Sequence, residues 1–226
     1  MAELLKKRTQ TILMRCVRTA RKTFTQVLIH VRPSKPKARK LARKSGKVRL
    51  NLGSGRALIT GWINVNIESN ADLVHDIRRG LPFESNSVDL IYNEHFIEHL
   101  SFQDGKRFLS ECFRCLKIGG ILRIATPDLD YVIDKYNTNW KDQDWLSWPG
   151  AEMISTKGQM INASFRWWGH KYFYNEEDLR EQLARTGVTH MMRCDINKSG
   201  YEDLRNLETR QDSTLIIEAS KEGSSH

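Results

Sequence analysis

The spacing of apolar residues changes near residue 48 of this 226-residue chain. From Val48 onward, short aliphatic runs alternate with stretches in which apolar positions recur every three or four residues. Short runs bounded by turn residues are typical of buried strands, and the longer spacing is typical of amphipathic helices. The pattern predicts strands at 48–52, 62–67, 71–75, 88–92, 121–125, 190–194 and 214–219.

Two helices have the clearest patterns. Residues 102–116 place Phe108, Cys112 and Leu116 on one apolar face, and the pair Gly119-Gly120 follows as a predicted stop. Residues 175–184 begin with Asn175 as a predicted cap, followed by three acidic residues in the first turn. Strands that alternate with helices predict an α/β domain with a mostly parallel sheet covered on both faces.

The positive charge of the chain is concentrated at its N-terminus. Residues 1–47 hold 15 Lys and Arg against Glu3 alone, whereas the rest holds 21 basic and 26 acidic residues. We therefore expect a basic amphipathic arm and linker at 1–47 and a domain at 48–226. Pro33, Pro36 and dense like charge predict that residues 32–47 do not fold compactly. The first thirty residues suit an anionic membrane surface, a nucleic acid or an organelle-targeting role.

Membrane and redox features are few. No apolar run approaches the roughly 18 to 20 residues that span a bilayer, so we expect a cytoplasmic protein, soluble or peripheral at the inner face of the membrane. The cysteines form neither a disulfide framework nor a zinc ribbon, because the single C-x-x-C pair has no second pair to complete a tetrahedral site. Cys112 and Cys115 lie on a helical pattern and are predicted to be buried.

Polar residues follow four of the predicted strands. The first strand ends in a turn where Gly53 and Gly55 can adopt positive φ and admit a ligand close to the main chain. The carboxyl ends of parallel strands meet at one edge of a sheet, so the other strand ends are expected nearby. An amide or carboxylate after the second strand suits ribose hydroxyls, and a carboxylate with the following amide after the third suits the amino edge of adenine. The candidate residues are Asn51, Gly53, Ser54, Gly55, Asn66, Glu68, Asp76, Ile77 and Asn93.

These residues occur within a longer series of motifs. The series runs through Leu50-Asn51-Leu52-Gly53-Ser54-Gly55, Gly61-Trp62-Ile63-Asn64-Val65-Asn66-Ile67, Asp76, Leu81-Pro82-Phe83, Ser87-Val88-Asp89-Leu90-Ile91, Glu98-His99-Leu100, Leu116-Lys117-Ile118-Gly119-Gly120 and Thr126-Pro127-Asp128. In this order they resemble the class I S-adenosylmethionine-dependent methyltransferases, and among them the small bacterial type 11-like branch associated with surface polysaccharide genes.

The resemblance covers about residues 48–220 and implies a Rossmann-like, doubly wound sheet of seven strands with the last strand antiparallel. It implies that S-adenosylmethionine lies over Gly53 to Gly55, with its ribose near Asn66 or Glu68, its adenine near Asp76 and Ile77, and its methionine end near Asn93. Two positions depart from the family pattern. Asn66 replaces the usual Asp, which removes a charge-assisted hydrogen bond, and Ile118 replaces the usual Pro.

The chemistry of such a transfer needs few protein groups. The sulfonium is already reactive, so the protein aligns the acceptor and, for a hydroxyl, removes a proton. His95, Asp128 and His170 are the candidate bases. No Asn-Pro-Pro-Tyr sequence follows the fifth strand, which favours oxygen over a base nitrogen as acceptor. We expect a saccharide or cell-envelope precursor, with RNA methylation through the basic arm or a non-catalytic scaffold as alternatives.

An aromatic segment interrupts the later part of the chain. We expect a lid insertion at about 135–174, whose aromatic residues can stack on a sugar or a nucleobase or can pack the lid onto the sheet. The ring-bearing residues are Trp140, Trp145, Trp148, Trp167, Trp168, Tyr172 and Tyr174.

One motif favours a different chemistry. His95-Phe96-Ile97-Glu98-His99 matches the inverted zinc-protease pattern H-x-x-E-H, in which two histidines on one helical face bind zinc. Here the motif follows a strand directly instead of lying inside a long helix. We therefore predict no metal ligands and keep the metalloenzyme as an alternative.

Overall fold

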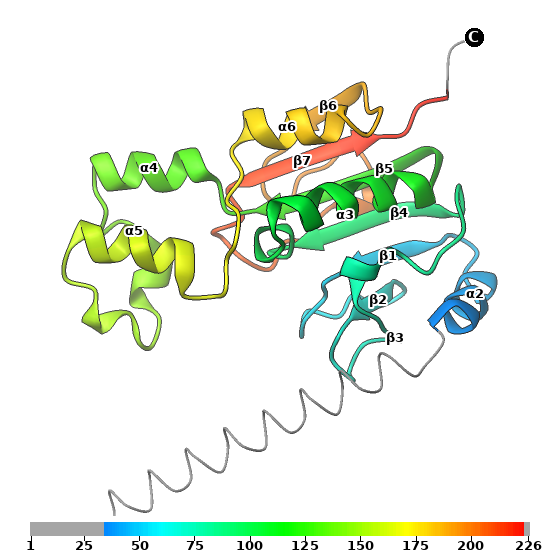
Figure 1. Cartoon of the computed structure of the whole chain (residues 1–226), viewed down its shortest axis with the longest axis horizontal. Coiled ribbons are helices and arrows are strands. Elements are labelled where there is room, and N and C mark those ends of the chain that lie inside the picture. The colour runs from blue at the N-terminus through cyan, green and yellow to red at the C-terminus, as the bar shows by residue number, and fades with distance from the viewer. Residues whose placement is uncertain (1–33, 224–226) are drawn as a thin grey trace, which may run out of the picture.

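Figure 1 shows the computed structural model, which describes residues 34–223. Seven strands form one sheet in the order β3-β2-β1-β4-β5-β7-β6. Neighbouring strands run parallel except that β7 is antiparallel to both β5 and β6. The strands are β1 (Arg49–Leu52), β2 (Ile63–Asn66), β3 (Leu73–Val74), β4 (Val88–Glu94), β5 (Leu116–Thr126), β6 (His190–Arg193) and β7 (Leu215–Ser220). The predicted seven-stranded sheet with an antiparallel last strand is confirmed.

The α-helices in the described part of the chain are α2 (Ser34–Lys44), α3 (Phe102–Cys115), α4 (Leu129–Asn137), α5 (Lys157–Arg166) and α6 (Glu176–Ala184). Short 3-10 helices are η1 (Ile77–Arg79), η2 (Ile97–His99), η3 (Asp144–Ser147), η4 (Ala151–Met153) and η5 (Glu202–Leu204). The predictions for α3 and α6 are confirmed, and their caps are Ser101 and Asn175, whose side chains accept hydrogen bonds from backbone N–H groups.

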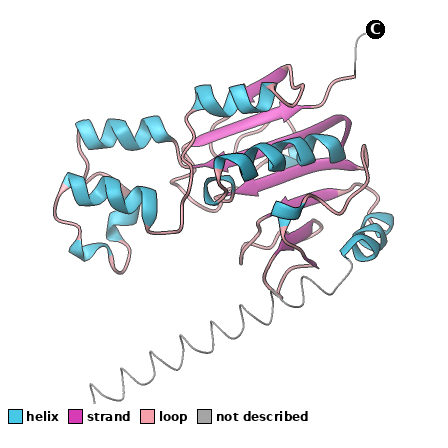
Figure 2. Cartoon of the chain, viewed as in Figure 1, coloured by secondary structure: helices cyan, strands magenta, loops and turns pink. Residues whose placement is uncertain are grey.

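The two faces of the sheet are covered differently. One face carries the main core, where Leu50, Leu122 and Ile217 of the strands pack with Phe108 of α3 and Leu179 of α6. Figure 2 shows α3 and α6 lying across this face. On the other face lies a smaller apolar cluster, which consists of Trp62, Leu90, Tyr92, Ile121 and Leu204. Leu204 belongs to the 3-10 helix η5, which covers this face.

The second face also holds buried charge. Arg123 of β5 is fully buried and donates to Glu208 (2.7 Å) and to Glu218 of β7 (2.6 Å). A buried guanidinium is stable only when carboxylates accompany it. This group therefore ties β5 and β7 to the segment that covers them.

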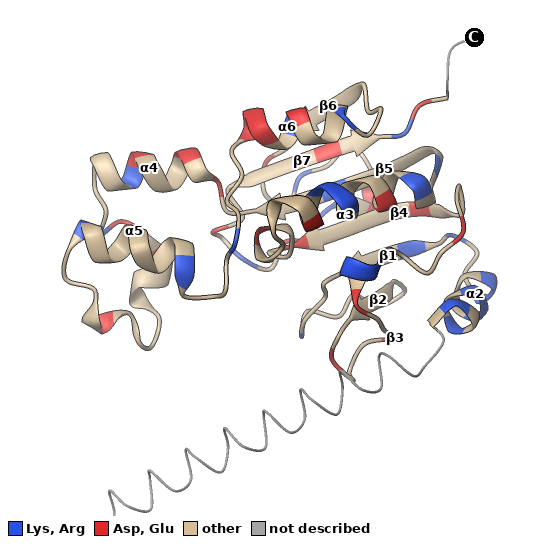
Figure 3. Cartoon of the chain, viewed as in Figure 1, with Lys and Arg blue, Asp and Glu red and all other residues tan. Residues whose placement is uncertain are grey.

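The prediction that residues 32–47 form an uncompacted linker is wrong for residues 34–44, which form helix α2. Ala38 is fully buried in the main core, and Leu41 and Ala42 pack against it. Pro36 lies in the first turn, where its missing N–H costs no intrahelical bond. The like charges point outward, and Figure 3 shows them as a blue helix beside β1 to β3. The division of the chain at residue 47 stays a prediction, and the amphipathic arm at 1–30 lies outside the described residues.

Helix α3 ends one residue earlier than predicted, and β5 begins at once with Leu116. Gly119-Gly120, predicted as a stop, lies inside this strand, where Gly119 has φ +77°. The pairing with β4 shifts register between Val88 and Leu90, so the two glycines accommodate an irregularity at the start of the strand.

The segment predicted as a lid insertion is largely helical. Helices α4 and α5 pack around a small core of Trp145, Met160 and Ala163, with Tyr136, Trp140, Leu146 and Ile154 at its margin. Figure 1 shows both helices projecting beyond the carboxyl ends of the central strands. The insertion is therefore a small folded unit.

Two further observations concern the described residues. Cys112 and Cys115 are buried and unpaired, as predicted. Among residues 34–223, no helix has both the length and the apolar character needed to cross a bilayer.

Candidate active site

The glycine turn after β1 is held by the end of β2. The Gly53 and Ser54 amides both donate to the Val65 carbonyl, at 2.9 and 3.3 Å. Gly53 and Gly55 have φ of +72° and +51°, as the sequence predicted. A Cβ at Gly53 would overlap the ring of Phe96, whereas a Cβ at Gly55 would meet nothing closer than 4.0 Å. A ligand can therefore come close to the backbone at Gly55. At Gly53 the ring of Phe96 already fills the equivalent space.

The side chain of Asn51 stabilises this turn. Its side-chain amide donates to the Ala57 carbonyl (2.8 Å) and to Asn64 Oδ1 (2.9 Å). Both contacts lie within the protein, so the structure gives Asn51 a role in shaping the turn. The Ser54 hydroxyl is buried and has no hydrogen-bond partner among the described residues, which leaves it available to a ligand.

The predicted ribose residues lie beside the turn. Asn66 Nδ2 lies 3.5 Å from the Gly55 carbonyl, and Asn70 Nδ2 donates to the same oxygen at 2.9 Å. Glu68 is exposed, and within residues 34–223 its carboxylate makes no hydrogen bond or ion pair. The structure thus brings Asn66 to the glycine turn and leaves Glu68 free in solvent.

The predicted adenine residues follow β3. Asp76 caps η1 and accepts two hydrogen bonds from the Arg78 guanidinium, each at 2.8 Å. This ion pair holds the pKa of Asp76 below its ordinary value. The side chain of Ile77 packs in the main core. An adenine amino group at Asp76 would therefore compete with Arg78 or share the carboxylate with it.

Asn93 occupies the carboxyl end of β4, next to β1, because Tyr92 pairs with Asn51. Its side chain is fully buried, and its amide lies 3.5 Å from the Arg123 carbonyl. Its Oδ1 atom has no partner in the described part of the chain. A buried acceptor without a partner is costly, which is consistent with a site that is completed by a ligand.

His95 follows β4 in a left-handed conformation, with φ +48°. Its amide extends the ladder to the Ala125 carbonyl (2.9 Å), and its ring is buried between Glu98 and Asp212, each 3.5 Å away. Burial, assisted by Arg210, lowers the pKa of His95 to about 3, so the imidazole is neutral. His95 lies between β4 and η2, so the H-x-x-E-H motif directly follows a strand, as the sequence indicated, and does not lie inside a long helix.

Glu98 lies at the centre of a buried polar group. Thr126 Oγ1 at the end of β5 donates to Glu98 Oε2 (3.1 Å), while Oε1 has no hydrogen-bond partner within residues 34–223. Burial raises the pKa of Glu98 to about 7. The backbone carbonyl of Glu98 accepts from the Lys171 amide at 2.8 Å, so the insertion returns to the sheet at this residue.

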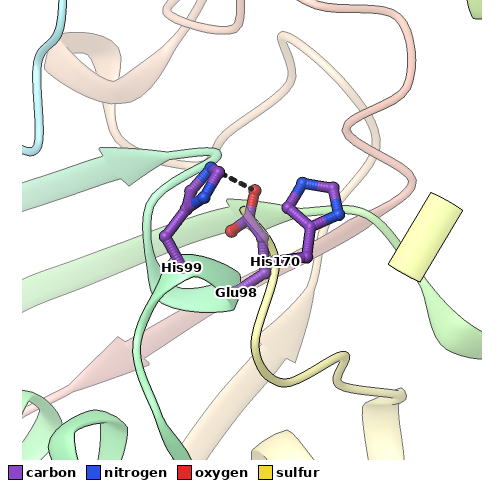
Figure 4. Close-up of side chains that lie close together, drawn as sticks. All are labelled: Glu98, His99 and His170. Carbon is purple, nitrogen blue, oxygen red and sulfur yellow. Dashed lines mark ion pairs between the residues drawn. The ribbon is translucent and has the colours of Figure 1, made fainter. Parts of the chain in front are cut away.

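Glu98, His99 and His170 gather their polar atoms within 4.8 Å of one another (Figure 4). His99 Nε2 lies 3.8 Å from Glu98 Oε1, and the two imidazole centroids are 4.9 Å apart. Burial and the neighbouring His170 lower the pKa of His99 to about 4, and burial also lowers that of His170. All three groups could ligate a cation or bind a polar acceptor.

Asp128 is occupied by structural contacts. It caps α4 by accepting from the Asp130 amide at 3.0 Å, and its other oxygen accepts from Arg193 Nη2 at 3.0 Å. Both carboxylate oxygens of Asp128 are therefore engaged within the fold. Its assignment as a base is untested and is less favoured than that of the two histidines.

Sequence reasoning selected His95 and His170 as separate candidates but left out Glu98 and His99. The H-x-x-E-H motif drew attention to both, yet nothing in the sequence showed that His170, 71 positions after His99, completes the group. The missing information is the path of the insertion, whose return is fixed by backbone hydrogen bonds to Glu98.

Comparison with known proteins supports the class of this domain. Residues 35–124 match the family model of a methyltransferase domain. Over 57 residues, the chain is 46% identical to a protein described as a probable S-adenosylmethionine-dependent methyltransferase from Mycolicibacterium smegmatis. That segment is 24% of this chain and 21% of the relative, so the match spans about a fifth of the relative's length.

Solved structures with a related outline are more distant in sequence. An S-adenosylmethionine-dependent methyltransferase from Archaeoglobus fulgidus is 17% identical, with a TM-score of 0.48 over 83% of this chain and 92% of its own. A phosphoethanolamine N-methyltransferase from Haemonchus contortus in complex with S-adenosyl-L-methionine is 16% identical, with a TM-score of 0.48 over 83% of this chain and 52% of its own.

The matched residues contain the glycine turn, the ends of β1 to β4 and the H-x-x-E-H motif. Over these residues the chain is similar to methyltransferase domains, including one described as S-adenosylmethionine-dependent. The family cofactor is S-adenosylmethionine, and the buried Ser54 hydroxyl and Asn93 Oδ1, both without partners in the described residues, fit a polar ligand at the edge where that cofactor is expected.

Proposed function

We propose that this protein transfers the methyl group of S-adenosylmethionine to a hydroxyl oxygen of a saccharide or related cell-envelope precursor. The observation that carries the acceptor class is a group of exposed indoles on the insertion. Trp148, Trp167 and Trp168 are each at least 40% exposed, and Trp168 packs edge-on against both of the others. Indole faces open to solvent suit the apolar faces of sugar rings.

These indoles lie next to the cluster of Glu98, His99 and His170. The ring of Trp168 lies 5.6 Å from that of His170, which itself lies 4.9 Å from His99. A sugar stacked on Trp168 would thus present its hydroxyls toward His170 and Glu98. Phe96, which packs on the glycine turn, directly precedes η2 and links this acceptor region to the proposed cofactor turn.

The proposal assigns cofactor binding, acceptor positioning and contact with the acceptor hydroxyl to different residues. Gly55, Ser54 and Asn66 bind the cofactor, with Asn93 near its methionine end, and the insertion positions the acceptor. The neutral His95 ring lies beside Glu98 and has an Nε2 without a hydrogen-bond partner in the described residues, so it can accept a hydrogen bond from the acceptor hydroxyl. Positioning contributes most of the rate, because the sulfonium is itself a strong methyl donor.

The acceptor is tested by mass spectrometry of saccharide, glycolipid and RNA fractions incubated with protein and labelled methyl donor. We expect label in the saccharide or glycolipid fraction. Trp168→Ala should weaken acceptor saturation while leaving calorimetric binding of S-adenosylmethionine unchanged. Tyr201→Ala removes an equally exposed ring from another segment and is the matched control. Absence of cofactor binding would instead support a scaffold.

RNA methylation is the second candidate, and helix α2 favours it. Six basic side chains lie on this helix: Lys35, Lys37, Arg39, Lys40, Arg43 and Lys44. Such a surface attracts phosphates, whether of nucleic acid or of an anionic membrane. Label in the RNA fraction, together with RNA binding that falls steeply with salt, would replace the saccharide proposal. A peripheral location at the inner face of the membrane rests on the same charge and on residues 1–30, and stays a proposal.

A further inference from the structure

We propose that Glu98, His99 and His170 form a binding site for one divalent transition-metal ion, with Zn²⁺ the best match. Two imidazoles and one carboxylate are a known catalytic zinc ligand set, which leaves a fourth position open. The three residues come from η2 and from the end of the insertion, and Figure 4 shows the carboxylate between the two rings.

The first argument is an unsatisfied buried acceptor. Glu98 is fully buried, and Thr126 occupies only its Oε2 atom. Oε1 has no hydrogen-bond partner in residues 34–223, although His95 Nδ1 lies 3.5 Å and His99 Nε2 3.8 Å from it. Burying a carboxylate oxygen without a partner is strongly unfavourable, and a cation between this oxygen and the two rings would remove the cost.

The second argument is the orientation of the histidine rings. His170 Nδ1 contacts the Ser164 carbonyl at 2.7 Å, which fixes the proton on Nδ1 and leaves Nε2 as the ligand atom. The His99 ring makes a backbone hydrogen bond at Gly169 and turns Nε2 toward Glu98. Metal-binding histidines characteristically use one ring nitrogen for a backbone or carboxylate partner and the other for the metal.

The distances require a modest adjustment. The ligand atoms lie within 4.8 Å of one another, and in a tetrahedral zinc site they would be about 3.3 Å apart. Small rotations of two partly exposed histidine side chains can close this difference. His95 is not one of the three grouped residues, although its Nδ1 lies 3.5 Å from Glu98 Oε1, and its Nε2 faces Asp212 at 3.5 Å.

The inference rests on the proposed function only for what would fill the fourth coordination position of the zinc ion, which is the acceptor oxygen. A hydroxyl bound to zinc loses its proton far more readily than a free one. The site itself is defined by its ligands and can be tested without any acceptor.

The test uses the full chain, produced without a polyhistidine tag and stripped with a chelator. Zn²⁺ is added, and bound metal is measured after gel filtration by elemental analysis and by competition with a chromogenic chelator. Co²⁺ provides a second reading, because a four-coordinate site gives an intense visible absorption band. We expect one equivalent of zinc per chain and such a band.

Glu98→Gln and His170→Gln should each lower zinc affinity by at least about tenfold. His190→Ala removes an exposed histidine of β6 and should bind zinc as the unmodified chain does. Circular dichroism of the metal-free proteins shows whether each variant is folded, and His99→Gln replaces either variant that is not. Failure of the unmodified chain to bind zinc, or equal loss in the His190 variant, would overturn the site. Zinc binding without methyl transfer to saccharides would overturn the proposed function and leave the site in place.

Discussion

The ring of Phe96 lies against the backbone of Gly53, in the position that a Cβ would occupy. Gly53→Ala is therefore expected to be destabilising by about 2 to 5 kcal/mol, because left-handed strain and overlap with the half-buried ring of Phe96 act together. Gly119→Ala is the matched control, since Gly119 has a similar φ of +77° and a Cβ added there would meet nothing within 4 Å. It should lose only about 1 kcal/mol. Urea unfolding measures both, and equal losses would contradict the packing argument.

The buried group of Arg123, Glu208 and Glu218 is expected to respond strongly to loss of one member. Arg123→Met leaves two buried carboxylates without a counter-charge and should reduce the free energy of unfolding by about 3 to 5 kcal/mol. Arg185→Ala breaks the exposed pair with Glu181 and should cost less than about 1 kcal/mol. Denaturant titration of both variants compares these values, and a small effect at Arg123 would show that the segment over β5 does not depend on it.

His75 is expected to make stability depend on pH. Burial lowers its pKa below the ordinary value of 6.5, and its Nε2 donates to the Gly80 carbonyl at 2.7 Å in the neutral form. The unfolded chain takes up a proton near pH 6.5 and the folded chain only at lower pH, so the stabilisation is complete above pH 6.5 and declines as pH falls through this window.

This dependence is measured by urea unfolding of metal-free protein at several pH values between about 5 and 8. His75→Gln should show a shallower loss of stability toward low pH than the unmodified chain. Parallel curves for the two proteins would indicate that His75 titrates alike in the folded and unfolded states.

Asp128 is expected to act as a structural residue. Asp128→Asn keeps an oxygen that can cap α4 and removes the charge that pairs with Arg193. Methyl transfer per folded molecule should stay within a few-fold of the unmodified protein, whereas loss of a general base lowers rates by about 10² to 10⁴. A drop of that size, measured with labelled donor at saturating cofactor, would restore Asp128 as the base.

Much of the fold follows from local patterns. The strands were predictable from short apolar runs, and α3 and α6 from apolar residues at helical spacing. Helix α2 was not, since its repelling charges and Pro36 argue against order, and packing of Ala38, Leu41 and Ala42 against the core offsets them. Tertiary contacts of this kind are invisible to a local reading.

The site was predictable to a similar extent. The glycine turn and Asn66 lie together as expected, because parallel strands bring their carboxyl ends to one edge. The contacts that occupy Asp76 and Asp128 depend on Arg78 and Arg193, and no spacing rule indicates such partners. The grouping of His170 with Glu98 depends on how the insertion folds.

The main-chain oxygen of Glu98 receives the amides of both Lys171 and Tyr172. His170 immediately precedes this clasp, so the insertion cannot swing outward at that end without carrying its imidazole away from η2. The α4–α5 unit therefore cannot move away at this end without separating His170 from Glu98 and His99. A ligand bound to these three residues would also hold in place the unit that carries the indoles.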